Sequence, residues 1–255
     1  MFGPWTPLVA LAASLLALLW LQRRVTYVLQ ELSVRWVNDA DVALIIYFVV
    51  VLPGVILHEL SHWLMAKLLG VRVTPPKIGP VRKGRSNRVS LGSVRVGKVD
   101  PVRASLIGVA PLLSGAAAIL LIGYLVLGVG ELADAAGRYG LEGLLDGLGA
   151  VVRVPDFWLW LYLIFAISNA MLPSESDMDA VRPVLIFLGI VTAVVVVVTG
   201  VRSIPPQVVD SVSAVAGYLA SSFGLTLAVD AVFIAVFGLL LLFTRWIQDG
   251  QLTGR

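Results

Sequence analysis

The two histidines of this chain, His58 and His62, are four residues apart, and Glu59 directly follows the first of them. On a helix, residues four apart lie on the same face, so both imidazoles can reach one metal ion. This HExxH pattern is typical of zinc hydrolases, in which the metal lowers the pKa of a bound water and the glutamate accepts its proton. The alternative is a pair of packed histidines that hydrogen-bond to the backbone or to Ser61.

A catalytic zinc site needs a third protein ligand and one position that is open to water. The chain has no cysteine and no third histidine, so this ligand is an aspartate or a glutamate. The acidic residues within or beside apolar segments are few: Glu131, Glu175, Asp177, Asp179 and Asp230. The cluster at 175–179 is favoured as the source of the third ligand, because the predicted topology places it on the same side of the membrane as His62. Asp230, in contrast, begins the last apolar segment on the opposite side. The alternative for the cluster is a solvated loop that caps the next helix.

The composition places these residues in a membrane protein. Hydrophobic residues make up 58% of the chain and charged residues only 14%, and the mean hydropathy is +0.93. A soluble domain of this size keeps about a quarter of its residues charged. The absence of cysteine also excludes disulfides, thiolate metal ligands and cysteine nucleophiles.

Six apolar segments are expected to be transmembrane helices, since about 20 apolar residues cross the hydrocarbon core of a bilayer. They lie at about 6–21, 42–69, 104–129, 157–172, 183–200 and 228–246. We expect the first to be a retained span, because no basic residue precedes it and no small-residue cleavage site follows it. The prediction is an all-α fold, a polytopic membrane helical bundle of about six transmembrane helices in a single domain over residues 1–255.

The stretches between these segments have their own patterns. Residues 71–102 contain several prolines and glycines and short alternating runs, which predict a small β-hairpin between the second and third helices. Residues 131–152 predict an interfacial amphipathic helix broken by glycines, and residues 206–223 predict a second one. Residues 22–41 are expected to form a linker of mixed composition.

The charge distribution predicts the orientation. Nine of the nineteen Lys and Arg residues lie between Arg72 and Arg103, against one acid, Asp100. A basic run can bind nucleic acid, but beside a membrane span it is more typical of the cytoplasmic side and of contact with anionic lipid. We therefore predict a multi-pass protein of the plasma membrane with this loop and both termini in the cytoplasm. The lipid bilayer is then a partner and nucleic acid is not.

Three motifs, in this order within residues 42–180, resemble the site-2 protease family of intramembrane zinc metalloproteases. They are the HExxH motif in the second apolar segment, Gly108 with Pro111 in the third, and Asn169 followed eight residues later by Asp177. In that family an Asn-x-x-Pro motif followed by Leu-Asp-Gly supplies the third zinc ligand, so the resemblance implies that Asp177 has this role. It also implies membrane-anchored protein substrates and a role for Asn169 in orienting substrate or binding the oxyanion. The alternative for Asn169 is a structural hydrogen bond between helices.

The chain departs from the family pattern in the third motif. Pro173 comes one residue later than the family's proline, and Asp177 is followed by Met178 instead of glycine and is not preceded by leucine. Asp179 therefore stays an alternative third ligand. We expect no PDZ-like or CBS-like insertion.

Together these patterns predict a zinc metallopeptidase that hydrolyses peptide bonds in or near transmembrane segments. His58, His62 and Asp177 are expected to bind Zn²⁺, while Glu59 takes a proton from water and passes it to the leaving amine. The 71–102 loop either offers a strand edge to the extended substrate or only contacts lipid. Two other classes stay open: a metalloprotease with a cytosolic catalytic domain and a glutamate ligand, and a non-enzymatic transporter or scaffold with a structural metal site. The intact Glu59 argues against the last, because a structural site needs no base.

Overall fold

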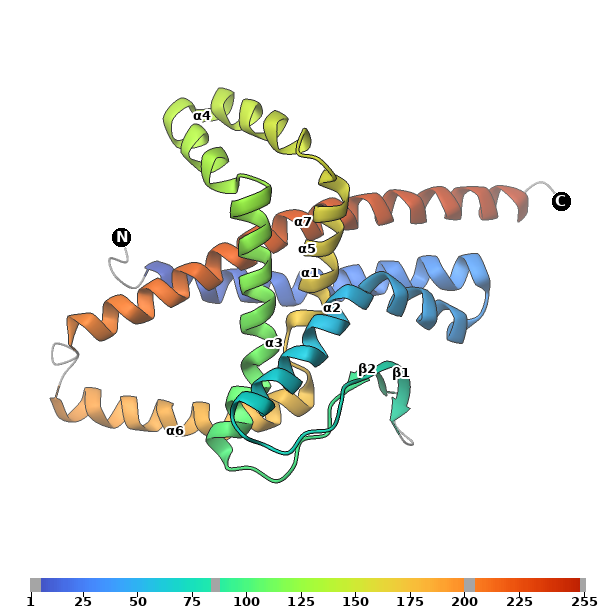
Figure 1. Ribbon diagram of the computed structural model, residues 1–255. Coiled ribbons are helices and arrows are strands. Elements are labelled where there is room, and N and C mark those ends of the chain that lie inside the picture. The colour runs from blue at the N-terminus through green and yellow to red at the C-terminus, as the bar shows by residue number, and fades with distance from the viewer. Residues whose placement is uncertain (1–5, 84–87, 200–204, 253–255) are drawn as a thin grey trace.

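The computed structural model describes residues 6–83, 88–199 and 205–252, which are mostly helical and include one small sheet. The elements are α1 (Thr6–Val37), α2 (Ala40–Leu68), β1 (Lys77–Lys83), β2 (Arg88–Ser93), α3 (Pro101–Leu121), the π-helical turn η2 (Ile122–Val126), α4 (Val129–Val152), α5 (Phe157–Met171), α6 (Glu175–Thr199) and α7 (Pro206–Leu252) (Figure 1). The predicted helical fold and the hairpin between the second and third helices are confirmed.

Four helices are long and apolar enough to cross a membrane: α1, α2, α3 with η2, and α7. Helices α4 and α5 meet at a bend of 96° and together form a fifth candidate, as a broken span or a re-entrant loop. These helices support a membrane protein. The count of about six spans stays a prediction, because four or five candidates are found within the described residues.

Helices α1 and α7 lie side by side and cross the pair formed by α3 and α5 (Figure 1). The predicted linker at 22–41 is wrong, since α1 continues without a break to Val37. Its apolar residues in this stretch recur at helical spacing and are buried, and Glu31 binds Arg35 at 3.0 Å and Arg245 of α7 through a contact of 2.6 Å. These interactions stabilise as a helix a stretch whose composition is mixed.

The predicted interfacial helices have different outcomes. Helix α4 confirms that the first stretch is a helix broken by glycine, while its interfacial position stays a prediction. The break falls at Gly140, which has φ +60° and ψ −132°, a conformation that glycine adopts far more readily than other residues. The second is not separate, because residues 206–223 form the first half of the continuous helix α7. Asp230 consequently lies inside a long helix and does not begin one.

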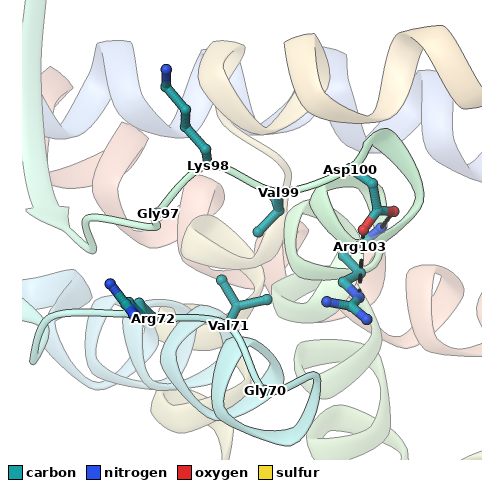
Figure 2. Close-up of a pocket in the computed structure, with 8 residues that line it drawn as sticks. All are labelled: Gly70, Val71, Arg72, Gly97, Lys98, Val99, Asp100 and Arg103. Atoms are coloured by element: carbon teal, nitrogen blue, oxygen red, sulfur yellow. Dashed lines mark hydrogen bonds and ion pairs between the residues drawn. The ribbon is translucent and has the colours of Figure 1, made fainter.

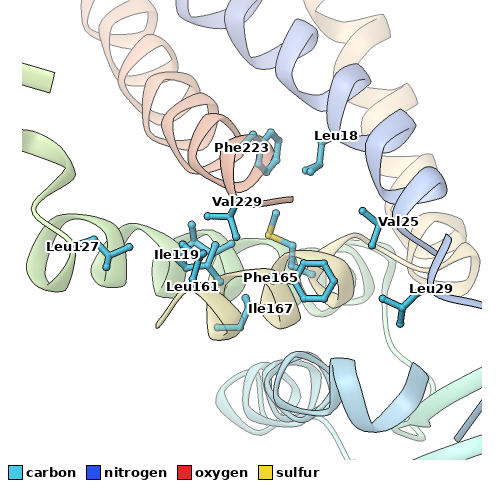
Figure 3. Packing of buried hydrophobic residues seen from close by; sticks show 12 residues of the cluster. Leu18, Val25, Leu29, Ile119, Leu127, Leu161, Phe165, Ile167, Phe223 and Val229 are labelled. Carbon is cyan, nitrogen blue, oxygen red and sulfur yellow. The ribbon is translucent and has the colours of Figure 1, made fainter. Parts of the chain in front are cut away.

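A buried apolar cluster holds α1, α3, α5 and α7 together (Figure 3). At its centre Phe165 of α5 stacks on Phe233 of α7, with ring centroids 4.2 Å apart. Helix α2 approaches α5 so closely that a Cβ atom at Gly54 would overlap the backbone carbonyl of Ala166. Gly54 is therefore a packing notch, one helical turn before His58, and it fixes the distance between the two helices that meet at the site.

Aspartates begin both helices that flank the hairpin. Asp39 accepts hydrogen bonds from the backbone N–H groups of Asp41 and Val42 at the start of α2, and Asp100 does the same for Val102 and Arg103 at the start of α3. An N-terminal side-chain cap of this kind satisfies amides that have no partner within the helix.

The hairpin is antiparallel, with Lys77 opposite Ser93 and Val81 opposite Ser90, and with an irregularity between Ile78 and Val81. An isolated bridge between Val73 and Val96 extends the pairing toward the ends of α2 and α3. The alternating runs that predicted the hairpin lie partly in this extension, outside the two regular strands.

Candidate metal centre

His58 and His62 lie one turn apart on α2, and each ring is fixed by a backbone carbonyl of another helix. His58 Nδ1 is 2.7 Å from the carbonyl oxygen of Ala170 in α5, and His62 Nδ1 is 2.8 Å from that of Ile107 in α3. A carbonyl oxygen only accepts hydrogen bonds, so each Nδ1 carries the proton and donates it. Both Nε2 atoms are thereby left with free lone pairs, as in histidines that bind a metal.

The two Nε2 atoms face each other and the carboxylate of Asp177. They are 3.1 Å apart, and Asp177 places Oδ1 3.3 Å from His62 Nε2 and Oδ2 3.7 Å from His58 Nε2. The three ligand atoms lie within 4.8 Å of one another. Metal–ligand bonds of about 2.0–2.1 Å in a tetrahedral site put neighbouring ligand atoms about 3.3 Å apart. The arrangement therefore fits one metal ion with a fourth position left for water.

The hydrogen bonds of the packed-histidine alternative are present only in part. Each ring bonds to the backbone through one nitrogen, but the Ser61 hydroxyl donates to the Leu57 carbonyl at 2.6 Å and lies 2.5 Å from the Ser114 hydroxyl. Backbone contacts at both Nδ1 atoms do not account for two Nε2 acceptors that face each other and a carboxylate. The lone pairs of these three groups repel one another, and a proton or a metal ion between them removes this repulsion.

Asp177 has a second function at the start of α6. Its Oδ2 accepts from the Ser174 backbone N–H at 2.8 Å and from the Ser174 hydroxyl at 2.6 Å, and the Asp177 N–H lies 3.4 Å from Ser174 Oγ. This reciprocal pattern is a capping box. Burial disfavours the charged carboxyl, but the two hydrogen bonds from Ser174 favour it. The carboxylate is thus available as a ligand.

The two candidate third ligands lie in different surroundings. Asp179 is exposed and lies 3.8 Å from Arg182 on the same helix, in a pair whose side chains are largely in solvent. Asp177 is the one brought to the histidines. The alternative for the 175–179 cluster was a cap of the next helix, and this cap is present too. Asp177 therefore both caps α6 and faces the histidines.

Glu59 is buried beside the histidines, with 7% of its surface exposed. The hairpin covers it: a Cβ atom at Gly92 of β2 would stand 2.5 Å from Glu59 Oε1 and 2.6 Å from its Cγ. Only glycine allows the strand backbone to come this close. The carboxylate therefore lies between α2 and the hairpin, where bulk water is excluded.

Asn169 makes structural hydrogen bonds. Its Nδ2 donates to the Phe165 carbonyl at 2.9 Å, to Ser168 Oγ at 3.3 Å and to Asp230 Oδ1 of α7 at 3.4 Å. Ser168 Oγ also donates to Asp230 Oδ1, at 3.0 Å. These bonds correspond to the alternative that the sequence left open, and a catalytic role for Asn169 stays a prediction.

Comparisons with family models, with curated proteins and with solved structures found no match for the chain. Function is therefore inferred from the geometry of the site.

Sequence reasoning missed three features of this site. The carbonyls of Ala170 and Ile107 leave no signal in the sequence, because any residue supplies a backbone oxygen. The contact of Gly92 with Glu59 depends on how the hairpin folds back over α2, although a glycine inside a strand is a recognised sign of close backbone approach. The contact of Asp230 with Asn169 depends on the full length of α7, inside which Asp230 lies.

Proposed function

We propose that this chain is an intramembrane zinc metalloprotease that hydrolyses peptide bonds in or near transmembrane segments of membrane-anchored proteins. The observation that carries the proposal is the convergence of His58 Nε2, His62 Nε2 and the Asp177 carboxylate within 4.8 Å of one another, with Glu59 buried next to them. Two imidazoles and one carboxylate are the ligand set of several catalytic zinc sites. The resemblance to the site-2 protease family agrees with this ligand set.

The chain's own groups have separate roles in this proposal. His58, His62 and Asp177 would hold the ion, which would supply Lewis-acid chemistry to the scissile carbonyl and to the attacking water. Glu59 accepts the proton of that water on its carboxylate and delivers it to the leaving amine. The covering strand at Gly92 excludes bulk water from Glu59, which strengthens the electrostatic interactions of its carboxylate.

The substrate backbone must be extended when it reaches the site. A transmembrane helix hides its carbonyls in internal hydrogen bonds, so the segment that is cut has to unwind locally. The β1–β2 hairpin lies directly over Glu59 and offers strand edges, which supports backbone pairing between the hairpin and an unwound substrate. We place the protein in the plasma membrane, with the hairpin loop and both termini in the cytoplasm, on the strength of the basic loop.

The decisive experiment measures zinc in detergent-purified protein by elemental analysis. We expect about one zinc per chain in the wild type. The zinc should be lost or sharply reduced in His58→Ala and Asp177→Ala and retained in Asp179→Ala, which is the matched control. A wild-type protein that is purified without chelators, holds no metal and takes none up would contradict the proposal.

Activity is tested separately with a reporter transmembrane helix reconstituted together with the enzyme. Glu59→Gln keeps the size of the side chain and removes the base, so we expect it to retain zinc and to lose cleavage. If zinc is bound and neither the wild type nor any variant cleaves membrane helices, the site is structural and the chain belongs with the non-enzymatic alternatives.

A further inference from the structure

A pocket of about 700 Å³ opens where α2 ends and α3 begins, apart from the metal centre. Its lining comes from two chain segments, Gly70–Arg72 and Gly97–Asp100, together with Arg103. Figure 2 shows Val71 and Val99 pointing toward each other from these segments, while Arg72 and Lys98 extend away from them. The pocket thus has an apolar floor and a basic rim.

Backbone hydrogen bonds preform this pocket. The Gly97 N–H donates to the Arg72 carbonyl at 2.9 Å, and the Thr74 N–H donates to the Arg95 carbonyl at 3.1 Å, on either side of the Val73–Val96 bridge. The segment that follows α2 is also tied back to the helix, because the Val71 N–H donates to the Ala66 carbonyl at 2.8 Å. The two segments therefore form a small fixed platform.

The rim carries uncompensated positive charge. Asp100 is the one acid in the lining, and it is used by the cap of α3 and by an ion pair with Arg103 at 3.4 Å. Within the described residues, neither Arg72 nor Lys98 has an acidic partner within 4.0 Å. A rim with three cations and one occupied carboxylate favours an anionic ligand.

The position of the pocket in the fold indicates the source of the anionic ligand. The pocket lies at the ends of two consecutive candidate spans, α2 and α3, so it must lie at one membrane surface. Large apolar side chains border it on the span sides, with Leu68 exposed by 73% and Val102 by 60%. One turn earlier, the Lys67 ammonium lies 5.7 Å from the centre of the Trp63 ring, a pairing of residue types that is common at the membrane interface.

We propose that this pocket binds the phosphate-bearing headgroup of an anionic phospholipid. Arg72 and Lys98 contact the phosphate, Val71 and Val99 pack against the glycerol region, and the acyl chains lie along the exposed apolar faces of α2 and α3. A free phosphate ion would meet the same cations but would make no use of the apolar floor or of the apolar borders.

Lipid binding is measured by native mass spectrometry on protein delipidated in detergent and then given phosphatidylglycerol or phosphatidylcholine. Each cation near an anionic lipid contributes about a fivefold preference, so the double variant Arg72→Gln/Lys98→Gln is expected to bind phosphatidylglycerol about 30-fold more weakly. Binding of phosphatidylcholine should not change. The matched control is Lys77→Gln/Arg95→Gln, which removes two exposed cations of the same loop outside the pocket and should bind like the wild type.

A second arm adds inorganic phosphate at millimolar concentration as competitor. We expect the bound phosphatidylglycerol to stay in place, because the ion lacks the apolar contacts. Equal loss of lipid in both double variants would mean a general effect of loop charge and would overturn the proposal. Displacement by inorganic phosphate would also overturn it, in favour of a free phosphate site. Circular dichroism of both variants verifies that they are folded.

Discussion

Gly92 of β2 lies against the carboxylate of Glu59, so closely that a Cβ atom at position 92 would stand 2.5 Å from Oε1. This relationship connects the hairpin to the residue that we propose as the general base. A substrate that approaches Glu59 has to share this space with the strand. The hairpin is therefore part of the active site in the proposed function. Position 92 is expected to tolerate other residues as poorly as the positions of the metal ligands do.

Replacing Gly92 should affect cleavage and leave the metal in place. In Gly92→Val the side chain displaces either the strand or the Glu59 carboxylate, and a misplacement of about 1 Å can reduce the rate about 100-fold. We expect a loss of that order in cleavage of a reporter helix, with wild-type zinc content. Ser93→Ala, in the neighbouring position, is the control and should cleave normally. Unchanged cleavage by Gly92→Val would show that the strand is not part of the site.

Replacing each of two helical glycines with alanine should change the stability in opposite directions, because only one of them lies in the contact between α2 and α5. Gly54→Ala forces a methyl group into the Ala166 carbonyl, and overpacking of this kind should lower the free energy of unfolding by about 1–3 kcal/mol. A Cβ atom at Gly224 of α7 would meet nothing within 4 Å, so the better helix propensity of alanine in Gly224→Ala should raise the free energy of unfolding by up to about 1 kcal/mol. Thermal unfolding in one detergent measures both. Equal effects of the two substitutions would rule out the close packing of α2 on α5.

Removing the Asp230 carboxyl should destabilise the bundle. Asp230 is fully buried and accepts hydrogen bonds from Ser168 and Asn169, so Asp230→Ala removes the buried hydrogen bonds that join α7 to α5. Such losses cost about 1–3 kcal/mol. Asp230→Asn keeps an acceptor and should be milder. Asp210→Ala, at an exposed position of the same helix, is the control. Thermal unfolding in which Asp230→Ala and Asp210→Ala are equally stable would contradict this reading of the contact.

The absence of cysteine permits a direct test of the predicted orientation. Single cysteines at Lys98 and Asp146 introduce one thiol each, at exposed positions on the hairpin loop and on α4. With the loop in the cytoplasm, a membrane-impermeant maleimide should label Asp146→Cys in intact cells and Lys98→Cys only after lysis. The reverse pattern would invert the topology, and labelling of both in intact cells would place the two positions on the same outer side.

Local sequence patterns predicted those parts of the site that are local in the chain. The spacing of His58 and His62 fixes their common face on any helix, and prolines and glycines mark the hairpin. Asp177 was reached by excluding other ligand types and by resemblance. The structure places it with the histidines and leaves Asp179 in solvent.

Features that depend on tertiary packing escaped prediction. The stretch at 22–37 has a mixed composition and is helical because its apolar stripe and Glu31 pack against α7, where the partner of Glu31, Arg245, is 214 residues away in the chain. The length of α7 was missed for a similar reason, since its first half has the pattern of an interfacial helix. The carbonyl oxygens that orient the two histidines are placed by the positions of their helices, and any residue type can supply them.

The double use of Asp177 makes the first turn of α6 an indicator of metallation. The same carboxylate caps that turn through Ser174 and completes the ligand set with His58 and His62. If a chelator removes a bound ion, the carboxylate is left facing two imidazoles and loses the cation that anchored it, so the turn is released from α2 and frays. Limited proteolysis between α5 and α6 should then accelerate on chelation and slow again when zinc is returned, which turns a helix boundary into a sensor of metal occupancy.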